Sequence, residues 1–368
     1  MKKAFVGLSG GVDSAVSTAL LKNRGYDVTG VFIKAWTPPG YPCPWKEDRQ
    51  SAMRAAAILN IPFVTLDLER EYKESVADYM IEEYKKGRTP NPDVVCNKEI
   101  KFGAFLKWAL ERGADFVATG HYARTSKGPL WPKGSGQGGP LEVLLMEGLD
   151  KNKDQSYFLW TLTQKQLRHI LFPIGHLQKE EVRKLARKFG LPQATRKDSQ
   201  GLCFLGQVDM KEFLSQSIES RKGDVLNTKR EIVGYHNGAA FFTIGERHGF
   251  TITRKTPSDK PLYVISKDMA KNTITVSPKI IIQQKSAIEG EPSLLPEVWL
   301  NNINWILDKL PVGNLECRLR YRQTKIPCKV TEEKGEIKIE LKENIYISPG
   351  QSLVLYDGEK CLGGGIMR

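Results

Sequence analysis

A loop of glycine and serine at residues 7–14 (Gly-Leu-Ser-Gly-Gly-Val-Asp-Ser) follows a short apolar run and precedes a helical pattern. Glycine lets the backbone turn tightly and approach an anion, and Ser9 and Ser14 add hydroxyl donors. Because the N-terminal end of a helix carries partial positive charge, the loop predicts a pyrophosphate site. It has neither the lysine of the ATPase P-loop nor the glycine spacing of a dinucleotide-binding loop.

Two cysteines lie in polar segments that suit thiol chemistry. Cys96 ends a proline-rich run, expected to be a loop between two helices, and Asp93 stands three residues before it. Cysteine reacts as the thiolate, so a helix N-terminus or a lysine such as Lys98 would lower the pKa of Cys96, while Asp93 could transfer a proton. Cys203 follows a turn-forming run, and the two thiols could alternate between persulfide, thiol and disulfide. A buried structural role is the alternative for each cysteine.

The other cysteines and the histidines form no metal-binding pattern. No two cysteines make a C-x-x-C pair, which argues against a zinc site and against a secreted disulfide framework. Of the five histidines, only His121 adjoins a candidate site, and the others lack ligand spacing. We therefore expect no metal held by protein side chains alone, and structural roles for Cys43, Cys317, Cys328 and Cys361.

Composition and charge favour a globular protein with a polyanionic partner. The 368 residues are 40% hydrophobic and 26% charged, with a formal net charge of +13. Residues 281–368 carry 12 basic and 12 acidic side chains, so the positive excess lies in residues 1–280 and suits RNA. The sequence has no apolar stretch of membrane-spanning length and no signal-peptide pattern, so we expect a cytoplasmic protein.

Apolar strands alternate with helical patterns over the first part of the chain. The strands are expected at residues 4–8, 28–33, 63–68 and 116–118, and the helices at 14–23, 47–59, 72–86 and 102–111. This alternation predicts an α/β domain with a doubly wound parallel sheet. Ligands bind beyond the carboxyl ends of such strands, where the loop at 7–14, the loop after Ile33 and residues 119–121 would converge.

Two smaller domains are expected to follow a first domain at residues 1–206. That domain would contain a mobile insertion at 125–141, which holds five Gly and three Pro, then a strand at 143–146 and helices at 164–171 and 179–189. A helix at 208–218 and short β segments, such as 239–244 and 262–266, predict a small central β-rich domain at 207–278. Runs of period two and the Asp357-Gly358 turn predict a C-terminal antiparallel β-barrel at 279–368.

Two groups of basic residues could meet RNA. Lys153 opens a helix where it could contact a phosphate, with Asp154 as the helix cap. The second group alternates along one face of an expected strand, beside Tyr321, and could follow an RNA backbone: Arg318, Arg320 and Arg322. A solvated strand face is the alternative.

Six motifs, in this order, resemble those of the tRNA-specific 2-thiouridylases, a family of PP-loop ATP pyrophosphatases. They are GLSGGVDS (7–14), NPDVVCNKEIKF (91–102), ATGHYAR (118–124), KDQSYFLW (153–160), DSQGLCFLG (198–206) and RYRQ (320–323). The resemblance implies a tRNA sulfurtransferase that uses ATP with Mg²⁺ to replace the C2 oxygen of the wobble uridine by sulfur. The sulfur would come from a cysteine persulfide, and AMP and pyrophosphate would be released.

The resemblance also implies roles for individual residues. Cys96 would be the nucleophile, Cys203 the persulfide carrier joined to it in a transient disulfide, and Asp93 the acid/base. ATP would be held by Gly7, Leu8, Ser9, Gly10, Gly11, Val12, Asp13, Ser14, Ile33 and Gly120, although Ile33 stands where the family often has Met. The tRNA would be contacted by Asn91, Pro92, Asp93, His121, Lys153, Asp154, Gln155, Arg320, Tyr321 and Gln351, the first three at the target base.

The implied partners are tRNA and a sulfur-relay protein or cysteine desulfurase, and a monomer is expected. Sulfur would reach the adenylated uridine directly from Cys203, or as hydrosulfide released by Cys96. Two alternatives belong to other classes. A PP-loop amide or amidine ligase would form an adenylate without any thiol, and a non-catalytic RNA-binding protein would tolerate changes at Asp13 and Ser14.

Overall fold

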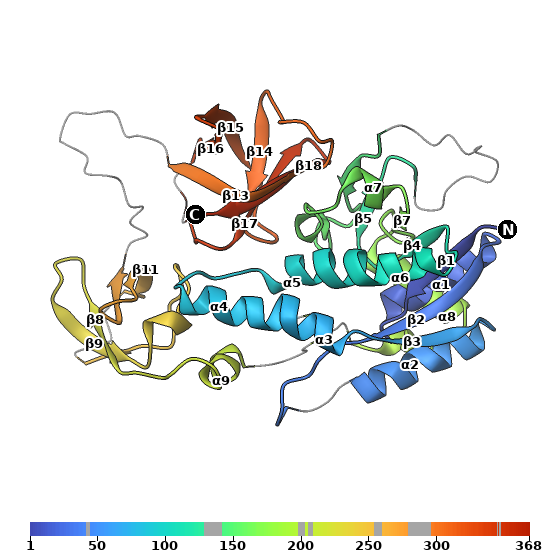
Figure 1. The fold of residues 1–368 in the computed structure, drawn as a ribbon, viewed down its shortest axis with the longest axis horizontal. Coiled ribbons are helices and arrows are strands. Elements are labelled where there is room, and N and C mark those ends of the chain that lie inside the picture. Colours follow the sequence, from blue (N-terminus) through green and yellow to red (C-terminus); the bar gives the residue numbers. More distant parts are fainter. Residues whose placement is uncertain are drawn as a thin grey trace.

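The computed structural model describes residues 1–41, 45–128, 142–197, 203–204, 209–253, 260–278, 296–343, 345 and 347–368. Cys43, residues 129–141 of the expected insertion and most of the segment around Cys203 lie outside these residues. The described chain forms an α/β body that carries the N-terminus, a small β-rich body and a β-barrel (Figure 1). None of the helices in these residues is long and apolar enough to cross a membrane.

The first body is built on a parallel five-stranded sheet, as expected. Its strand order is β3-β2-β1-β4-β7, formed by β1 (Lys3–Gly7), β2 (Asp27–Lys34), β3 (Phe63–Asp67), β4 (Phe116–Ala118) and β7 (Ile170–Leu171). β1 pairs with β2 on one side and with β4 on the other. The strand order therefore reverses at β1, with β2 and β3 on one side of it and β4 and β7 on the other. Ligands bind at such a switch point, and the 7–14 loop lies at its carboxyl edge.

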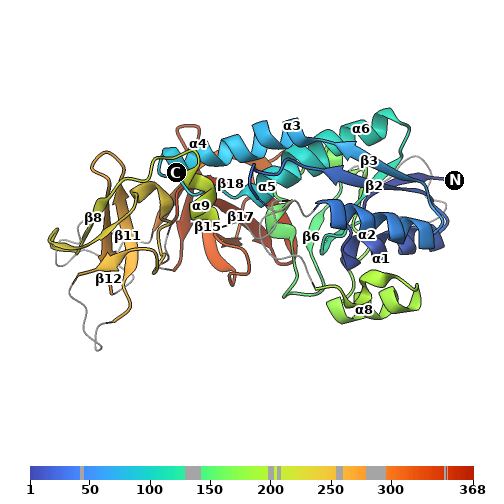
Figure 2. The same cartoon turned by 90° about the horizontal axis from the view of Figure 1, so that it is seen from below.

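Helices cover both faces of this sheet (Figure 2). On one face, α1 (Val12–Asn23), α2 (Trp45–Ile58) and α8 (Lys179–Lys188) bury apolar side chains against Leu8 and Phe32. On the other face, Val31 and Ile33 pack against the helices that carry Tyr72 and Cys96. Side chains of a strand alternate between the two faces, so β2 supplies both cores.

Two helical rods lie side by side on the second face (Figure 1). The first joins α3 (Glu69–Tyr72), the π-helix η1 (Lys73–Asp78) and α4 (Tyr79–Lys85), and the second joins α5 (Pro92–Val95), the π-helix η2 (Cys96–Ala104) and α6 (Phe105–Glu111). The second rod begins at Pro92, not near Phe102, so the expectation that Cys96 lies in a loop is wrong. Asn91 caps the rod by accepting a hydrogen bond from Val94 N–H (3.3 Å), and proline suits the first helical position.

Two other expected elements differ from the structure. The helix expected at 164–171 ends early: α7 (Gln164–Leu167) is followed by β7, which pairs with β4 at the sheet edge. The strand expected at 239–244 begins instead as the short 3₁₀-helix η5 (Ala239–Phe241), which contributes Ala239 to the core of the central body. Tertiary packing outweighs the local pattern in both short segments.

The central body is a five-stranded sheet that follows α9 (Met210–Ser215). Its strands, in spatial order, are β10 (Thr251–Ile252), β9 (Ile232–His236), β8 (Gly223–Leu226), β12 (Thr273–Ser277) and β11 (Tyr263–Asp268). Val225, Phe242 and Val264 lie in its core. Met269 of this body packs against Gly87, just beyond α4, so the sheet sits at the end of the first helical rod.

The C-terminal strands close into an antiparallel barrel, as expected. They are β13 (Glu297–Trp305), β14 (Leu315–Arg318), β15 (Ile326–Glu333), β16 (Glu336–Leu341), β17 (Ser352–Asp357) and β18 (Lys360–Met367), and the pairing of β13 with β18 closes the ring. The hairpin of β5 (Ala123–Thr125) and β6 (Leu145–Glu147) from the first body adds to β18. β5 and β6 lie on either side of the expected insertion in the sequence, and together they join the α/β body to the barrel.

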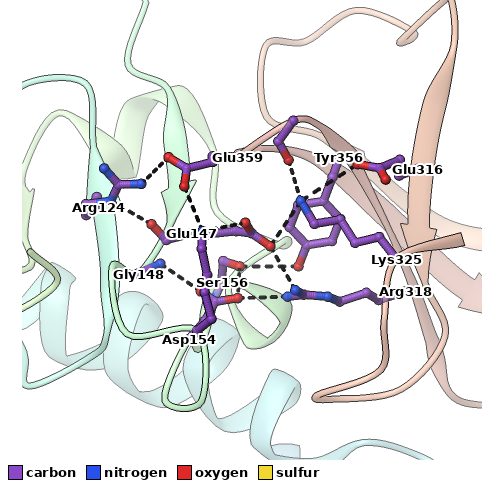
Figure 3. Close-up of polar contacts among 12 residues, drawn as sticks. Arg124, Glu147, Gly148, Asp154, Ser156, Glu316, Arg318, Lys325, Tyr356 and Glu359 are labelled. Carbon is purple, nitrogen blue, oxygen red and sulfur yellow. Dashed lines mark hydrogen bonds and ion pairs between the residues drawn. The ribbon is translucent and has the colours of Figure 1, made fainter. Parts of the chain in front are cut away.

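A cluster of ion pairs fixes this junction (Figure 3). Arg318 is mostly buried and donates to Asp154 (2.8 Å), and it also pairs with Glu147 (2.9 Å). Lys325 of the barrel approaches the same Glu147 carboxylate (3.2 Å). β14 ends at Arg318, so the expected alternation of Arg318, Arg320 and Arg322 along one strand face is wrong, and Arg318 serves the domain interface.

Replacing Arg318 with Met should destabilise the protein by about 3 kcal/mol, because Asp154 and Glu147 would lose a buried ionic partner. Chemical unfolding, followed by intrinsic fluorescence, would measure the loss. Lys329→Met is the matched control, because Lys329 is exposed on the same barrel and should change stability by less than about 0.5 kcal/mol. Equal effects of the two changes would show that the cluster does not fix the junction.

Candidate active site

The 7–14 loop joins the end of β1 to the start of α1. Gly11 is the residue before the helix, and it provides no side chain to cap the first helical N–H groups. The loop is held by its own hydroxyl groups: Ser14 Oγ accepts from Ser9 N–H (3.1 Å) and donates to Gly11 O (3.2 Å). An uncapped helix start framed by serine hydroxyls suits a phosphate group.

Two glycines allow neighbouring segments to approach this loop closely. Gly10 has a φ of +83°, and a Cβ there would lie 2.3 Å from the Asp48 carbonyl oxygen. A Cβ on Gly120, after β4, would lie 2.7 Å from Ser14 N. The loops after β1 and β4 therefore meet, as the sequence predicts. Ile33, at the end of β2, is buried on the face that carries the thiols.

Charged side chains that the sequence analysis did not single out surround the loop. Lys179, the first residue of α8, donates to both carboxylate oxygens of Asp13 (2.8 Å each), and the Tyr122 hydroxyl donates to one of them (2.8 Å). Arg196 donates to Gly10 O (2.9 Å) and pairs with Asp48. These contacts place two cations where a polyphosphate would bring negative charge. Their only sequence signal is position, at a helix start and just before the Cys203 segment.

The two predicted thiols lie together. Cys96 Sγ is 3.3 Å from Cys203 Sγ, and both are free thiols, because a disulfide would hold the sulfurs at about 2.05 Å. Cys96 is buried on η2 and Cys203 is partly exposed. Asp93 Oδ1 accepts a hydrogen bond from Cys203 N–H (3.0 Å), and the Tyr72 hydroxyl donates to Cys203 O (2.7 Å). Residues from both helical rods thus fix the Cys203 backbone.

The two thiols have opposite electrostatic properties. The hydrogen bond that Cys96 donates, together with the charge of Lys101, lowers the pKa of Cys203 to about 7, although its partial burial acts in the opposite direction. Burial and the same hydrogen bond raise the pKa of Cys96 well above its usual value, so the expectation of a lowered pKa for Cys96 is wrong. Lys98 also differs from expectation, because it is exposed and pairs with Glu99 (3.0 Å).

Burial raises the pKa of the third expected catalytic group, Asp93. Its carboxylate accepts the Cys203 N–H, so the position of Asp93 is tied to the thiol loop. A carboxyl group with a raised pKa exchanges a proton more readily near neutral pH than an ordinary aspartate does. In the described residues, no three His, Cys, Asp or Glu side chains form a group that could hold a metal ion.

Several residues expected to contact tRNA lie near the junction of the three bodies. Gln351 of the barrel donates to Thr89 O (2.8 Å) and Pro90 O (3.1 Å), directly before Asn91. Arg320 and Gln351 line a cavity of about 370 Å³ between the central body and the barrel. Tyr321 packs on Phe158, with ring centroids 4.5 Å apart. Arg320 and Tyr321 are at least partly exposed, as an RNA contact requires.

The other residues expected to contact tRNA are more enclosed. His121 is buried, its Nδ1 lies 2.7 Å from Thr119 Oγ1, and burial lowers its pKa well below the usual value. Asp154 is buried in the ion-pair cluster, and Gln155 Oε1 accepts from Tyr122 N–H (3.0 Å). Lys153 remains partly exposed. In this conformation, His121 and Asp154 support loops and offer no surface to RNA.

Comparisons with known proteins cover the chain almost completely. Family models match residues 2–207 (tRNA methyl transferase HUP domain), 211–278 (tRNA methyl transferase PRC-barrel domain) and 296–367 (aminomethyltransferase beta-barrel domain). The tRNA-specific 2-thiouridylase MnmA of Bacillus subtilis is 42% identical over 371 residues, 99% of this chain and 94% of that protein. The protein of the same name from Streptococcus thermophilus is 42% identical over 372 residues, 99% and 95% of the two chains.

Proposed function

The chain belongs to the tRNA-specific 2-thiouridylase family and is a tRNA sulfurtransferase of the PP-loop type, and we propose that Cys203 carries the sulfur and Cys96 completes its transfer. The single observation that carries this proposal is the 3.3 Å separation of the two thiols. A PP-loop ligase would need no such pair, so the geometry favours thiolation over the ligase alternative.

The first step is activation of the uridine by ATP. The C2 oxygen attacks the α-phosphorus, pyrophosphate leaves, and AMP remains on the oxygen as a good leaving group. The serine hydroxyls and the start of α1 would hold the phosphates, with Lys179 and Arg196 close by. With ATP bound, the Asp13 carboxylate would hold the accompanying Mg²⁺ ion in place of the Lys179 ammonium, and the ion would screen the phosphate charge.

The second step is sulfur transfer. The outer sulfur of a Cys203 persulfide attacks C2, and AMP leaves with the former C2 oxygen. Cys96 then attacks Cys203 Sγ, the bond to the transferred sulfur breaks, and that sulfur keeps the electron pair as the C2 thiocarbonyl. The Cys96 proton passes to a base, a role that we assign to Asp93, whose carboxylate accepts the N–H of the neighbouring Cys203. Alternatively, Cys96 attacks first and releases hydrosulfide, which attacks C2. Either route ends in a Cys96–Cys203 disulfide that an external dithiol must reduce.

Partners and compartment follow from this chemistry. Cys203 is partly exposed and has a lowered pKa, as a thiol that receives sulfur from a sulfur-relay protein or cysteine desulfurase requires. The free thiols suit the reducing cytoplasm. We expect the protein to act as a monomer, because the described residues of a single chain contain both the phosphate loop and the thiol pair.

The proposal is tested by incubating the purified protein with tRNA, ATP, L-cysteine, a cysteine desulfurase and a dithiol. Mass spectrometry of the digested tRNA should show 2-thiouridine, and AMP and pyrophosphate should form in equal amounts. Protein lacking both Cys96 and Cys203 should make no 2-thiouridine under these conditions. Product formation by that variant at the rate of the unmodified protein would refute the thiol mechanism and favour direct use of free sulfide.

Salt should weaken tRNA binding more than ATP binding, because each phosphate contact releases counterions. Arg320→Ala should lower the slope of log affinity against log salt by about one unit, as expected for one lost phosphate contact. Filter binding at several salt concentrations would measure both slopes. Arg24→Ala is the control, because Arg24 ends α1 at the opposite end from the phosphate loop. An unchanged slope for Arg320→Ala would remove the RNA-facing role from this part of the barrel.

A further inference from the structure

Lys101 lies on the same helical segment as Cys96 and reaches the loop that carries Cys203. In an α-helix, residues five apart are separated by about 140° around the axis. η2 is a π-helix, in which residues five apart are hydrogen-bonded neighbours, so Cys96 and Lys101 share a face. Lys101 Nζ lies 5.8 Å from the ring centroid of Phe204, the residue after Cys203. The helix geometry therefore places one ammonium group on the face that carries Cys96 and near the residue that follows Cys203.

Four ionisable groups face the Cys203 thiol from the helices packed around it. They are Cys96 and Lys101 on η2, Asp93 on α5 and Tyr72 on α3. Of these four, only Lys101 carries a positive charge. Burial by itself would lower the pKa of Lys101, but the charges of Cys203 and Cys96 raise it overall, so Lys101 is cationic.

We propose that Lys101 gives the two thiols different protonation states, holding Cys203 as the thiolate while Cys96 remains a thiol. The inference rests on the proposed thiol mechanism, and it identifies the residue that determines which of the two thiols reacts first. A thiolate at Cys203 accepts sulfur from a donor persulfide, because the thiolate is the nucleophile in such exchange. A protonated Cys96, 3.3 Å away, can stabilise that thiolate by hydrogen bonding without competing for the donor.

A purely structural role for Lys101 is the competing explanation. The ammonium group could simply anchor the Cys203 loop through its contact with Phe204. That role would affect folding or loop order, but it would not move the titration of a thiol in a folded protein. The pH dependence of Cys203 reactivity therefore separates the two explanations.

The test measures alkylation of Cys203 by iodoacetamide across pH 5–10, with the modified peptide quantified by mass spectrometry. In the unmodified protein, the rate should have its midpoint near pH 7. Lys101→Met should move the midpoint up by at least one pH unit and slow alkylation at pH 7 at least about fivefold, and Lys101→Arg should restore both. Lys98→Met is the matched control, because Lys98 is an exposed neighbour that pairs with Glu99. An unchanged midpoint in folded Lys101→Met protein would overturn the inference.

Two further measurements keep the outcome clear. If Lys101→Met does not fold, Lys101→Gln replaces it. The unmodified protein gives a separate test, because the alkylation midpoint of Cys203 must lie at a lower pH than that of Cys96. The reverse order of the two midpoints would overturn the inference. Failure of the proposed function would look different. Unmodified protein that makes no 2-thiouridine would refute thiolation whatever the alkylation midpoints, whereas thiolation with an unmoved midpoint in Lys101→Met would refute only the role of Lys101.

Discussion

Cys203→Ser protein should still convert ATP to AMP and pyrophosphate in the presence of tRNA, while desulfurase-driven formation of 2-thiouridine falls by roughly three orders of magnitude or more. Activation needs the phosphate loop and the C2 oxygen of the uridine but no thiol. Sulfur transfer needs the carrier that lies 3.3 Å from Cys96. The two steps should therefore separate in this variant, and parallel assays of AMP and 2-thiouridine would show it.

The control for this prediction is Cys361→Ala, which removes a buried thiol of the barrel. It should leave both products near their normal levels. Cys203→Ser should also regain part of its product when sulfide is supplied at high concentration, because sulfide can attack the adenylated uridine without a carrier. Loss of AMP formation together with thiolation would contradict the order of the two steps.

Much of the first domain could be predicted from the sequence because its signals are local. The 7–14 loop follows a short apolar strand, and the alternation of strands and helices predicted a parallel sheet that the structure confirms. The boundaries of β4 also agree with the prediction. The glycines of this loop favour a tight turn between a strand and a helix, so the position of the loop could be predicted from residue types alone.

The thiol site was harder to predict from the sequence, because the pKa values of its groups depend on helix geometry. The residues after Asn91 were expected to form a loop, whereas the capped rod continues as a π-helix. The π-helical segment selects Lys101 over Lys98 as the cation beside the thiols, and no sequence pattern distinguishes these two lysines. The predicted direction of the pKa change at Cys96 was wrong for the same reason. The pKa is raised by burial and by a hydrogen bond to a residue that is distant in sequence.

The residues expected to contact RNA were the hardest to place from the sequence. Alternation of Arg318, Arg320 and Arg322 looked like one strand face, but β14 ends at Arg318, and Arg322 has a φ of +62°. Arg318 pairs with buried carboxylates of the first domain, and these carboxylates lie more than 160 residues earlier in the chain. A period-two pattern predicts a strand only while its backbone pairing lasts, and pairing depends on the neighbouring strand.

Asp13→Asn should reduce tRNA-dependent conversion of ATP to AMP by at least about a hundredfold while leaving the fold intact. The substitution keeps the shape of the side chain and removes its charge, so Asp13 can no longer match the Lys179 ammonium that lies 2.8 Å from both oxygens. An amide is also a poorer partner for Mg²⁺ than a carboxylate. Pyrophosphate release measures the effect, and tRNA affinity at fixed salt should not change, because Asp13 lies in the phosphate loop.

Asp115→Asn is the matched control. Asp115 immediately precedes β4, at the amino-terminal ends of the parallel strands and away from the phosphate loop, and it pairs with the exposed Lys2. It should leave pyrophosphate release unchanged. If folded Asp13→Asn protein released pyrophosphate at the normal rate, the 7–14 loop would not be the site of ATP cleavage. The thiol pair would then need another source of activation, since a uracil carbonyl oxygen does not leave without one. The outcome at Asp13 therefore decides whether the phosphate loop and the thiol pair form one active site.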